Sequence, residues 1–269
     1  MLQTAVRRPT VPFSRKKRSF LILLCCAFVT ALCSTGQIKN QPVEFSVLLY
    51  LTTQASAAHL SFLKVHWPKL LEKSRLLRSA DVFIFSTGNP ALNEEMKSTF
   101  SKNPSCAVQN FENPGLQEGA NLAVSWGIYS GLFKGYDWII RLNPDVIIVN
   151  DTWISKTLKD DDVDAIFVDC FEKCLAGNCT NDALLIHTDF FAVRPRVLKE
   201  GSFNSTTFYL IGNAERVATH EFQNILYRGK HRWLPGVGPM QGNCRVRGKD
   251  SPIIHSHDSN INISLLLVD

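Results

Sequence analysis

The feature that most constrains this chain is an alternation of short apolar segments with segments whose apolar residues recur at helical spacing. The apolar segments lie at 45–53 (FSVLLYLTT), 80–87 (ADVFIFST), 106–111 and 137–142 (DWIIRL), and each has the length of a strand. Continuous apolar runs of this kind are typical of strands that are covered on both faces. The sequence therefore predicts an α/β fold with a mostly parallel, Rossmann-type sheet and helices on both faces.

Helical spacing fills the intervals between these strands, over 57–78, 91–101 and 117–133. Pro68 must kink or divide the first of these helices, because its ring excludes a regular hydrogen-bonded turn. In the third helix we expect one face to point toward the core, formed by Leu122, Trp126, Tyr129 and Phe133.

The pattern continues less regularly in the second half of the chain. We expect further strands at 164–171 and 184–193 and a helix at 213–227. The remainder is rich in glycine and proline, which indicates loops.

The N-terminus carries the signals of a targeting segment. Six basic residues and no acidic residue precede position 20, and an uncharged stretch, FLILLCCAFVTALC, follows over 20–33. This stretch has the length of a signal-peptide core, and extended to residue 38 it suffices for a thin bilayer. Both interpretations place the rest of the chain in the lumen, because the basic flank stays cytoplasmic. A buried helix of a soluble protein is the alternative.

These signals divide the chain into four parts. We expect a basic cytoplasmic tail at 1–19, a signal anchor or signal peptide at 20–38, a short stem at 39–44 and a lumenal domain at 45–269. The expected location is the membrane of the Golgi or endoplasmic reticulum, as a single-pass type II protein, with secretion as the alternative. The net charge of +5 comes from the N-terminal cluster, so composition gives no indication of nucleic-acid binding.

Cysteines and glycosylation sequons fit the same compartment. Cys170, Cys174 and Cys179 crowd into CFEKCLAGNC, which predicts a local disulfide bond in an oxidising lumen. A zinc site is the alternative, although the spacing lacks a matching second pair. Cys106 and Cys244 make the count outside the apolar segment odd, so one thiol is free or pairs between chains. Sequons of a glycoprotein occur at Asn150, Asn178, Asn204 and Asn262.

The segment DWIIRLNPDVIIV carries the clearest chemical signal. Asn143 and Asp145 follow a buried strand at its carboxyl end, where ligands bind in sheets of this kind. Two oxygen-bearing side chains one residue apart reach a common hard cation such as Mn²⁺ or Mg²⁺. The alternative is a strand followed by an Asn-Pro turn in which Asp145 acts as a cap. Neither a G-x-G-x-x-G motif nor a P-loop is present, which argues against the familiar dinucleotide and P-loop modes of binding.

The order of strands and helices, followed by YDWIIRLNPDV, resembles the GT-A class of glycosyltransferases. In that class a D-x-D motif at this place holds a metal and a nucleoside-diphosphate sugar. The resemblance covers about residues 45–260 as a pattern and is close over 135–148 and 187–195. The motif here reads N-P-D, with Asn143 in place of the first acid, and one carboxylate fewer weakens metal binding.

The resemblance implies which residues contact the donor. Thr52 and Thr53, at the end of the first strand, would contact the nucleotide sugar together with Arg141, Asn143 and Asp145. The same two residues, Asn143 and Asp145, would hold the metal.

A late histidine completes the metal shell in several GT-A families, and this chain offers His255 and His257 in IIHSHD. Residues spaced i and i+2 on a strand project to the same face, so both histidines can converge there. A solvated polar tail is the alternative. Three basic residues precede these histidines, namely Arg245, Arg247 and Lys249. They pair with diphosphate oxygens or are surface charges.

Two acids are candidates for the base that deprotonates the acceptor hydroxyl if the enzyme inverts the configuration of the sugar. Asp189 lies in HTDFFAVRP, which is similar to the GT-A strand that lines the donor and acceptor side of the cleft. Its apolar context is expected to raise its pKa toward that of a useful base. Glu221 lies beside His220 on the 213–227 helix, where GT-A enzymes often supply an acid. A strand-edge aspartate bonded to the backbone and an ordinary surface glutamate are the alternatives.

We therefore expect a glycosyltransferase that moves a sugar from a nucleoside-diphosphate donor to a glycan or glycoprotein acceptor. A carbohydrate-binding protein on the same fold, inactive because N-P-D no longer holds metal, is the alternative. A lumenal hydrolase ranks last, because the sequence contains neither G-x-S-x-G nor H-E-x-x-H.

Overall fold

The computed structural model describes residues 45–169, 185–235 and 251–255. The predicted membrane segment, the cysteine cluster, Cys244, two sequons, the late basic residues and His257 lie outside this part of the chain. Within it, no helix is both long enough and apolar enough to cross a membrane, and Cys106 is a free thiol.

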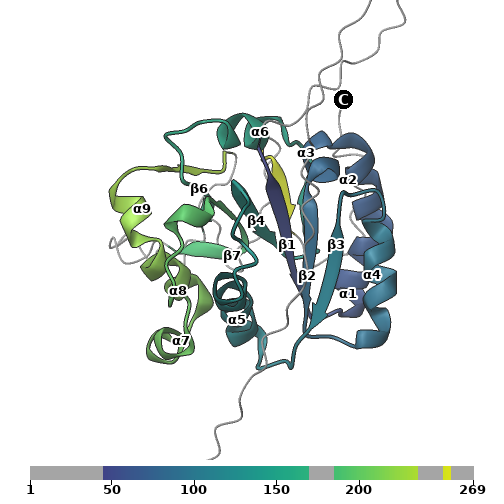
Figure 1. The fold of residues 1–269 in the computed structure, drawn as a ribbon, viewed down its shortest axis with the longest axis horizontal. Coiled ribbons are helices and arrows are strands. Elements are labelled where there is room, and N and C mark those ends of the chain that lie inside the picture. The colour runs from purple at the N-terminus through teal and green to yellow at the C-terminus, as the bar shows by residue number, and fades with distance from the viewer. Residues whose placement is uncertain (1–44, 170–184, 236–250, 256–269) are drawn as a thin grey trace, which may run out of the picture. The chain divides into compact units, whose positions relative to one another are not determined.

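The centre of the fold is a seven-stranded sheet with the order β3-β2-β1-β4-β7-β6-β8 (Figure 1). Neighbouring strands from β3 to β4 are parallel, whereas β7 is antiparallel to both β4 and β6. The prediction of a mostly parallel α/β sheet is therefore confirmed. The strands are β1 (Val47–Thr53), β2 (Asp81–Ser86), β3 (Cys106–Asn110), β4 (Trp138–Leu142), β6 (Ala165–Asp169), β7 (Ile186–Val193) and β8 (His231–Trp233).

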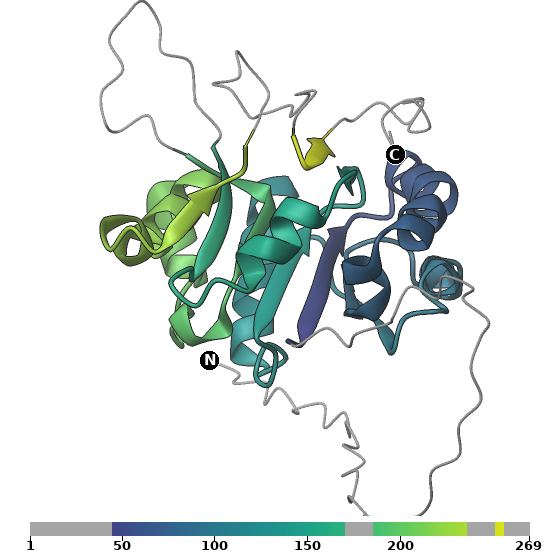
Figure 2. The same ribbon diagram turned by 90° about the horizontal axis from the view of Figure 1, so that it is seen from above.

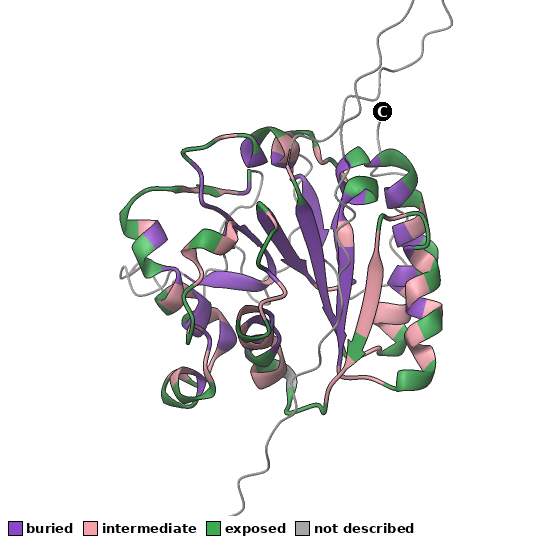
Figure 3. Cartoon of the chain, viewed as in Figure 1, coloured by how far each residue is buried: buried purple, intermediate pink, exposed green. Residues whose placement is uncertain are grey.

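Helices cover both faces of the sheet, and each face has its own apolar core (Figures 2 and 3). Successive residues of β1 alternate between the two cores, with Leu49 and Leu51 on one side and Leu48 and Tyr50 on the other. Burying one such leucine contributes roughly 1.5–3 kcal/mol. The first core is covered by α2 (Trp67–Lys73), α3 (Arg75–Ser79), α4 (Asn93–Thr99) and α6 (Thr152–Leu158), and the second by α5 (Leu116–Tyr129), α7 (Ser205–Ile211), α8 (Ala214–Glu221) and α9 (Gln223–Tyr227).

The predicted helix over 57–78 is divided, as the proline required. It consists of α1 (Ala57–Ser61), a π-helical turn η1 (Phe62–His66), α2 and α3. Pro68 has no N–H group and its ring would press on the carbonyl of residue 64, and the wider turn immediately before it relieves this conflict. In that turn the N–H of Trp67 donates to the carbonyl of Phe62, five residues back. Trp67 itself is fully buried, and its Nε1 donates to the carbonyl of Pro144 over 2.9 Å.

The predicted inner face of α5 was correct at two of its four residues. Phe133, just after the helix, is buried in the second core, and Trp126 packs against that core. Tyr129 is 78% exposed and Leu122 37% exposed, whereas the small residues Ala123 and Val124 are buried. The face that packs on the sheet is therefore rotated toward Ala123 and Val124.

The most important element that the sequence did not specify is a second, two-stranded sheet. In it β5 (Val146–Ile148) pairs antiparallel with β9 (Ile253–His255), and Val146 lies opposite His255. The predicted helix over 213–227 is likewise two helices, α8 and α9, separated at the buried Phe222.

Gly127 of α5 offers a test of the packing between this helix and the core. A Cβ atom at Gly127 would lie 2.2 Å from the ring of Phe133, whereas at Gly119 of the same helix the nearest atom would be 3.9 Å away. Alanine normally stabilises a helix interior relative to glycine by about 0.5–1 kcal/mol, and we expect Gly119→Ala to show this gain. Gly127→Ala should instead lower the free energy of unfolding by about 1–3 kcal/mol. Urea titrations of both variants measure the difference, and equal stability of the two would contradict the packing described here.

Candidate functional site

A cavity of about 450 Å³ opens at the carboxyl ends of β1, β2 and β4, the edge of the sheet where the sequence predicted a site. The end of β1 contributes Thr52 and Thr53 to its wall, and the turn after β4 contributes Asn143 and Asp145. Because β7 runs in the opposite direction to β4, it is the first half of β7 that reaches this edge, and it brings Asp189 to the cavity.

A row of hydrogen bonds connects four residues along the floor of the cavity. Arg141 is 2% exposed, and its Nη2 donates to Oγ1 of Thr52 over 2.7 Å. Thr52 Oγ1 donates to Oδ1 of Asn143 over 2.7 Å, and Nδ2 of Asn143 donates to Oδ1 of Asp189, also over 2.7 Å. Burial lowers the pKa of Arg141 and the negative charge of Asp189 opposes this, but a guanidinium remains protonated in proteins.

Asp145 is buried between two histidines. Its Oδ2 lies 3.5 Å from Nε2 of His255, and its Oδ1 lies 3.7 Å from Nε2 of His59. Burial by itself raises the pKa of Asp145, but hydrogen bonds and charge from His255 and His59 outweigh this effect and hold the pKa well below its usual range. Asp145 is therefore a buried carboxylate that stays ionised.

The local structure explains how each histidine reaches Asp145. The β5–β9 ladder places His255 opposite Val146, the residue that follows Asp145 in the chain. His59 comes from α1, and its Nδ1 lies 3.0 Å from Oγ1 of Thr53. That hydroxyl also accepts from the N–H of Ala55 over 2.8 Å, so the loop after β1 fixes the orientation of the imidazole.

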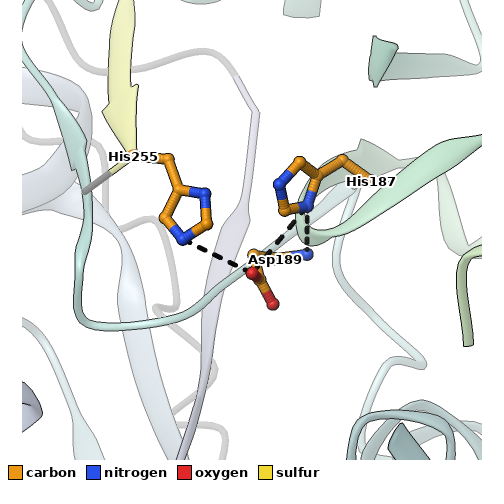
Figure 4. A group of neighbouring side chains, drawn as sticks. All are labelled: His187, Asp189 and His255. Carbon is orange, nitrogen blue, oxygen red and sulfur yellow. Dashed lines mark hydrogen bonds and ion pairs between the residues drawn. The ribbon is translucent and has the colours of Figure 1, made fainter. Parts of the chain in front are cut away.

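Asp189 also lies between two histidines, as Figure 4 shows. Its Oδ2 is 3.4 Å from Nε2 of His255 and 3.9 Å from Nδ1 of His187. One ligand atom from each of His187, Asp189 and His255 falls within 4.8 Å of the others. Imidazole nitrogens and carboxylate oxygens suit divalent transition metals such as Mn²⁺ or Zn²⁺, so these residues fit a metal ion.

Comparison with known proteins gives information at the level of the fold. No protein-family model and no curated protein matches the sequence. Among solved structures, core-mannan synthase A from Aspergillus fumigatus, solved in a Mn/GDP form, superimposes with a TM-score of 0.50 at 11% identity, covering 70% of this chain and 72% of that one. The fold of this chain is that of the GT-A nucleotide-sugar glycosyltransferases.

Two further solved structures are similar at lower scores. The glycosyltransferase GlyE from Streptococcus pneumoniae gives a TM-score of 0.43 at 8% identity, covering 71% of this chain and 45% of that one. The mannosyltransferase PcManGT from Pyrobaculum calidifontis, in complex with GDP-Man and Mn²⁺, gives 0.42 at 14% identity, covering 72% and 56%. The chain thus spans less than half the length of GlyE.

The structure brings most of the expected site residues of the GT-A-like domain together. The cavity is lined by Thr52, Thr53, Arg141, Asn143, Asp145 and Asp189. His255 contacts both Asp145 and Asp189. Asp189 does not have the apolar environment expected from its sequence neighbours, because Asn143, Arg141 and two histidines surround its carboxylate.

Glu221 differs from the other expected residues, because it does not line the cavity. Its Oε1 accepts from the backbone N–H of Phe203 over 3.1 Å. The acid of α8 that does line the cavity is Glu215, in the first turn of the helix, and its Oε1 accepts from Oγ1 of Thr188 over 2.9 Å. The expectation of an acid from this helix therefore fits Glu215 and not Glu221.

Sequence reasoning also missed His59 and His187. His187 precedes Asp189 by two residues on the same strand, so the alternation of β7 was a signal that both side chains share a face. His59 had no comparable signal, because its approach to Asp145 depends on the fold of the loop after β1.

The low pKa of Asp145 predicts a pH dependence of stability. The unfolded chain has an aspartate pKa of about 3.9, so in acid the unfolded state binds the extra proton first. The ionised carboxylate thus contributes stability that is present above about pH 4 and is lost as the pH falls toward the folded-state pKa. In EDTA, we expect the free energy of unfolding to fall more steeply between about pH 4 and pH 2 in the wild type than in Asp145→Asn. Urea titrations across this range measure both slopes, and parallel slopes would show that the folded structure does not favour the ionised form.

Proposed function

We propose that this chain transfers a sugar from a nucleoside-diphosphate donor to a glycan or glycoprotein acceptor. The observation that best supports the proposal is the meeting of three remote segments at one edge of a GT-A fold. The N-P-D turn after β4 brings Asp145 to the cavity and β7 brings Asp189, while the buried His255 of β9 contacts both carboxylates. These segments are remote in sequence, and the core packing of the domain alone does not require a cluster of ionisable groups at this edge.

The walls of the cavity suit a ligand that carries negative charge. The first turn of α5 lines it through Gln117, and helix N-termini carry partial positive charge and favour phosphate groups. The residue at the N-cap of α5 is Gly115, which has no side chain to accept from the first N–H groups of the helix. Arg141 adds positive charge from the sheet. We assign this region to the nucleoside diphosphate.

The ligand set favours Mn²⁺ over Mg²⁺, because Mg²⁺ prefers oxygen ligands and the set includes the imidazole of His255. Asp145 and His255 would hold the cation at the N-P-D turn. When bound, such a cation neutralises the negative charge that develops on the leaving diphosphate.

Glu215 is the residue that we assign to the acceptor hydroxyl. It lines the cavity and is only half-buried, so a substrate hydroxyl can approach it. The hydroxyl of Thr188 holds one carboxylate oxygen in place. A positioned carboxylate of this kind serves as a general base.

We further propose that the domain works in the lumen of the Golgi or endoplasmic reticulum, with Mn²⁺ as the metal available to it. The basic tail and apolar segment over 1–38 and the sequons support this location. Asn150 lies exposed on the surface, as a glycosylated asparagine must.

Donor hydrolysis by the full-length protein tests the proposed function. We expect turnover of a UDP- or GDP-sugar in Mn²⁺, loss of turnover in EDTA, and a fall of about 100-fold or more in Asp145→Asn. The matched control is Asp162→Asn, an exposed aspartate outside the cavity, which should retain wild-type turnover.

A folded protein that binds a glycan array but cleaves no donor would favour the carbohydrate-binding alternative. Turnover that Asp145→Asn leaves unchanged would contradict the assignment of the site.

The roles of the two acids of α8 are separable by a pair of matched variants. Glu215→Gln should lower transfer to a glycan acceptor by about 100-fold or more while the Kd for the donor changes little, because a base acts after the donor has bound. Glu221→Gln should retain transfer, since its side chain contacts the backbone of Phe203 outside the cavity. Initial rates with a panel of free glycans, together with donor binding by calorimetry, measure both effects. A larger loss in Glu221→Gln would reverse the assignment.

A further inference from the structure

Asn143 stands where the resemblance to GT-A enzymes leads one to expect an acid, and its hydrogen bonds specify what it does instead. A guanidinium is donor-only, so the Arg141 Nη2–Thr52 bond commits the oxygen of Thr52 to accept there. The single proton of that hydroxyl is then donated to Oδ1 of Asn143. The amide must therefore present its NH₂ group on the other side, where Nδ2 donates to Asp189.

This order of donors and acceptors has a consequence for metal binding. The NH₂ group of an amide has no lone pair for a cation, and it is the NH₂ group of Asn143 that faces Asp189. Its Oδ1 faces Thr52 at the hydrogen-bonding distance of 2.7 Å. Asn143 is thus placed to hold Asp189 and not to hold a cation.

The two oxygens of Asp189 have different surroundings. Oδ1 is occupied by Nδ2 of Asn143 at 2.7 Å and lies 3.7 Å from Nη1 of Arg141. Oδ2 points the other way, toward the histidines, and lies 3.4 Å from Nε2 of His255. One oxygen fixes the carboxylate in place, and the other faces the metal-binding cluster.

The oxygen that faces the cluster has a counterpart on Asp145. Nε2 of His255 lies 3.5 Å from Oδ2 of Asp145 and 3.4 Å from Oδ2 of Asp189. Both distances lie within the range of an ion pair. They match the spacing of atoms that share one cation, since ligand bonds of about 2.0–2.2 Å at right to tetrahedral angles separate the ligands by roughly 3–3.5 Å.

We infer that the cation is held by Asp145, Asp189 and His255. The carboxylate of β7 thereby replaces the acid that the N-P-D motif lacks, and Asn143 is a positioning residue that aims this carboxylate. This inference rests on the proposed function for placing a metal in the cavity. It concerns which side chains hold the ion, and it is tested by ion binding without any donor or turnover.

The experiment is a Mn²⁺ titration of the full-length protein, followed by the loss of the free-ion signal in electron paramagnetic resonance. Asp189→Asn should weaken Mn²⁺ binding by about 100-fold or more, because a ligand is lost, whereas Asn143→Ala should weaken it by about 10-fold, as the loss of an outer partner does. The exchange Asn143→Asp with Asp189→Asn should not recover the lost affinity, because a carboxylate at 143 faces Thr52 and residue 189 and not the cation. Asp162→Asn serves as the unaffected control, and melting curves in EDTA verify that each variant is folded.

Two results would overturn the inference. The first is wild-type affinity in Asp189→Asn with a larger loss in Asn143→Ala, which would make Asn143 the ligand. The second is an exchanged double variant that, as folded protein, binds Mn²⁺ as tightly as the wild type, which would make 143 a ligand position. Neither result affects donor turnover that depends on Asp145, so a failure of this inference is distinguishable from a failure of the proposed function.

Discussion

The burial of one positive charge, Arg141, organises the floor of the site. Removing a guanidinium from water costs several kcal/mol unless polar partners surround it. In this domain the partners come from the two strands that flank β4, with Thr52 on β1 and Asp189 on β7. The position of Asp189 is therefore coupled to the interior of the sheet. A carboxylate fixed in this way keeps its geometry at low entropic cost, which a side chain on a surface loop does not achieve.

The sequence predicted the sheet well because the evidence for buried strands is local. A run such as VLLYLTT in β1 specifies a strand covered on both faces without reference to any other part of the chain. The same argument located Asn143 and Asp145 at the edge of the sheet, since the carboxyl end of a parallel strand has a known place in the fold. Asp189 was also identified as a site residue. The expected rise of its pKa, however, assumed an apolar environment, and the structure instead places Asn143 and Arg141 beside its carboxylate.

The remaining parts of the site depend on contacts between segments that are remote in sequence. His59 reaches Asp145 because Thr53 orients the loop after β1, and no periodic pattern encodes that contact. The choice between Glu215 and Glu221 depends on which end of α8 faces the cavity, and this is set by the packing of the helix on β7. Leu122 and Tyr129 of α5 were mispredicted for a similar reason, because the rotation of the helix on the sheet depends on remote contacts such as the stacking of Trp126 on Phe83.

The ladder between β5 and β9 gives the site a property of its own. Three residues on each strand form this sheet, and the seven-stranded sheet does not include either of them. Both strands are buried, and Ile253 of β9 belongs to the first core, so opening of this ladder would expose apolar core residues and is costly in free energy. Opening would withdraw His255 from both aspartates, and an ion bound there would oppose it by mass action. Hydrogen exchange at the backbone amides of β9 and cation binding at the site consequently report on the same opening equilibrium.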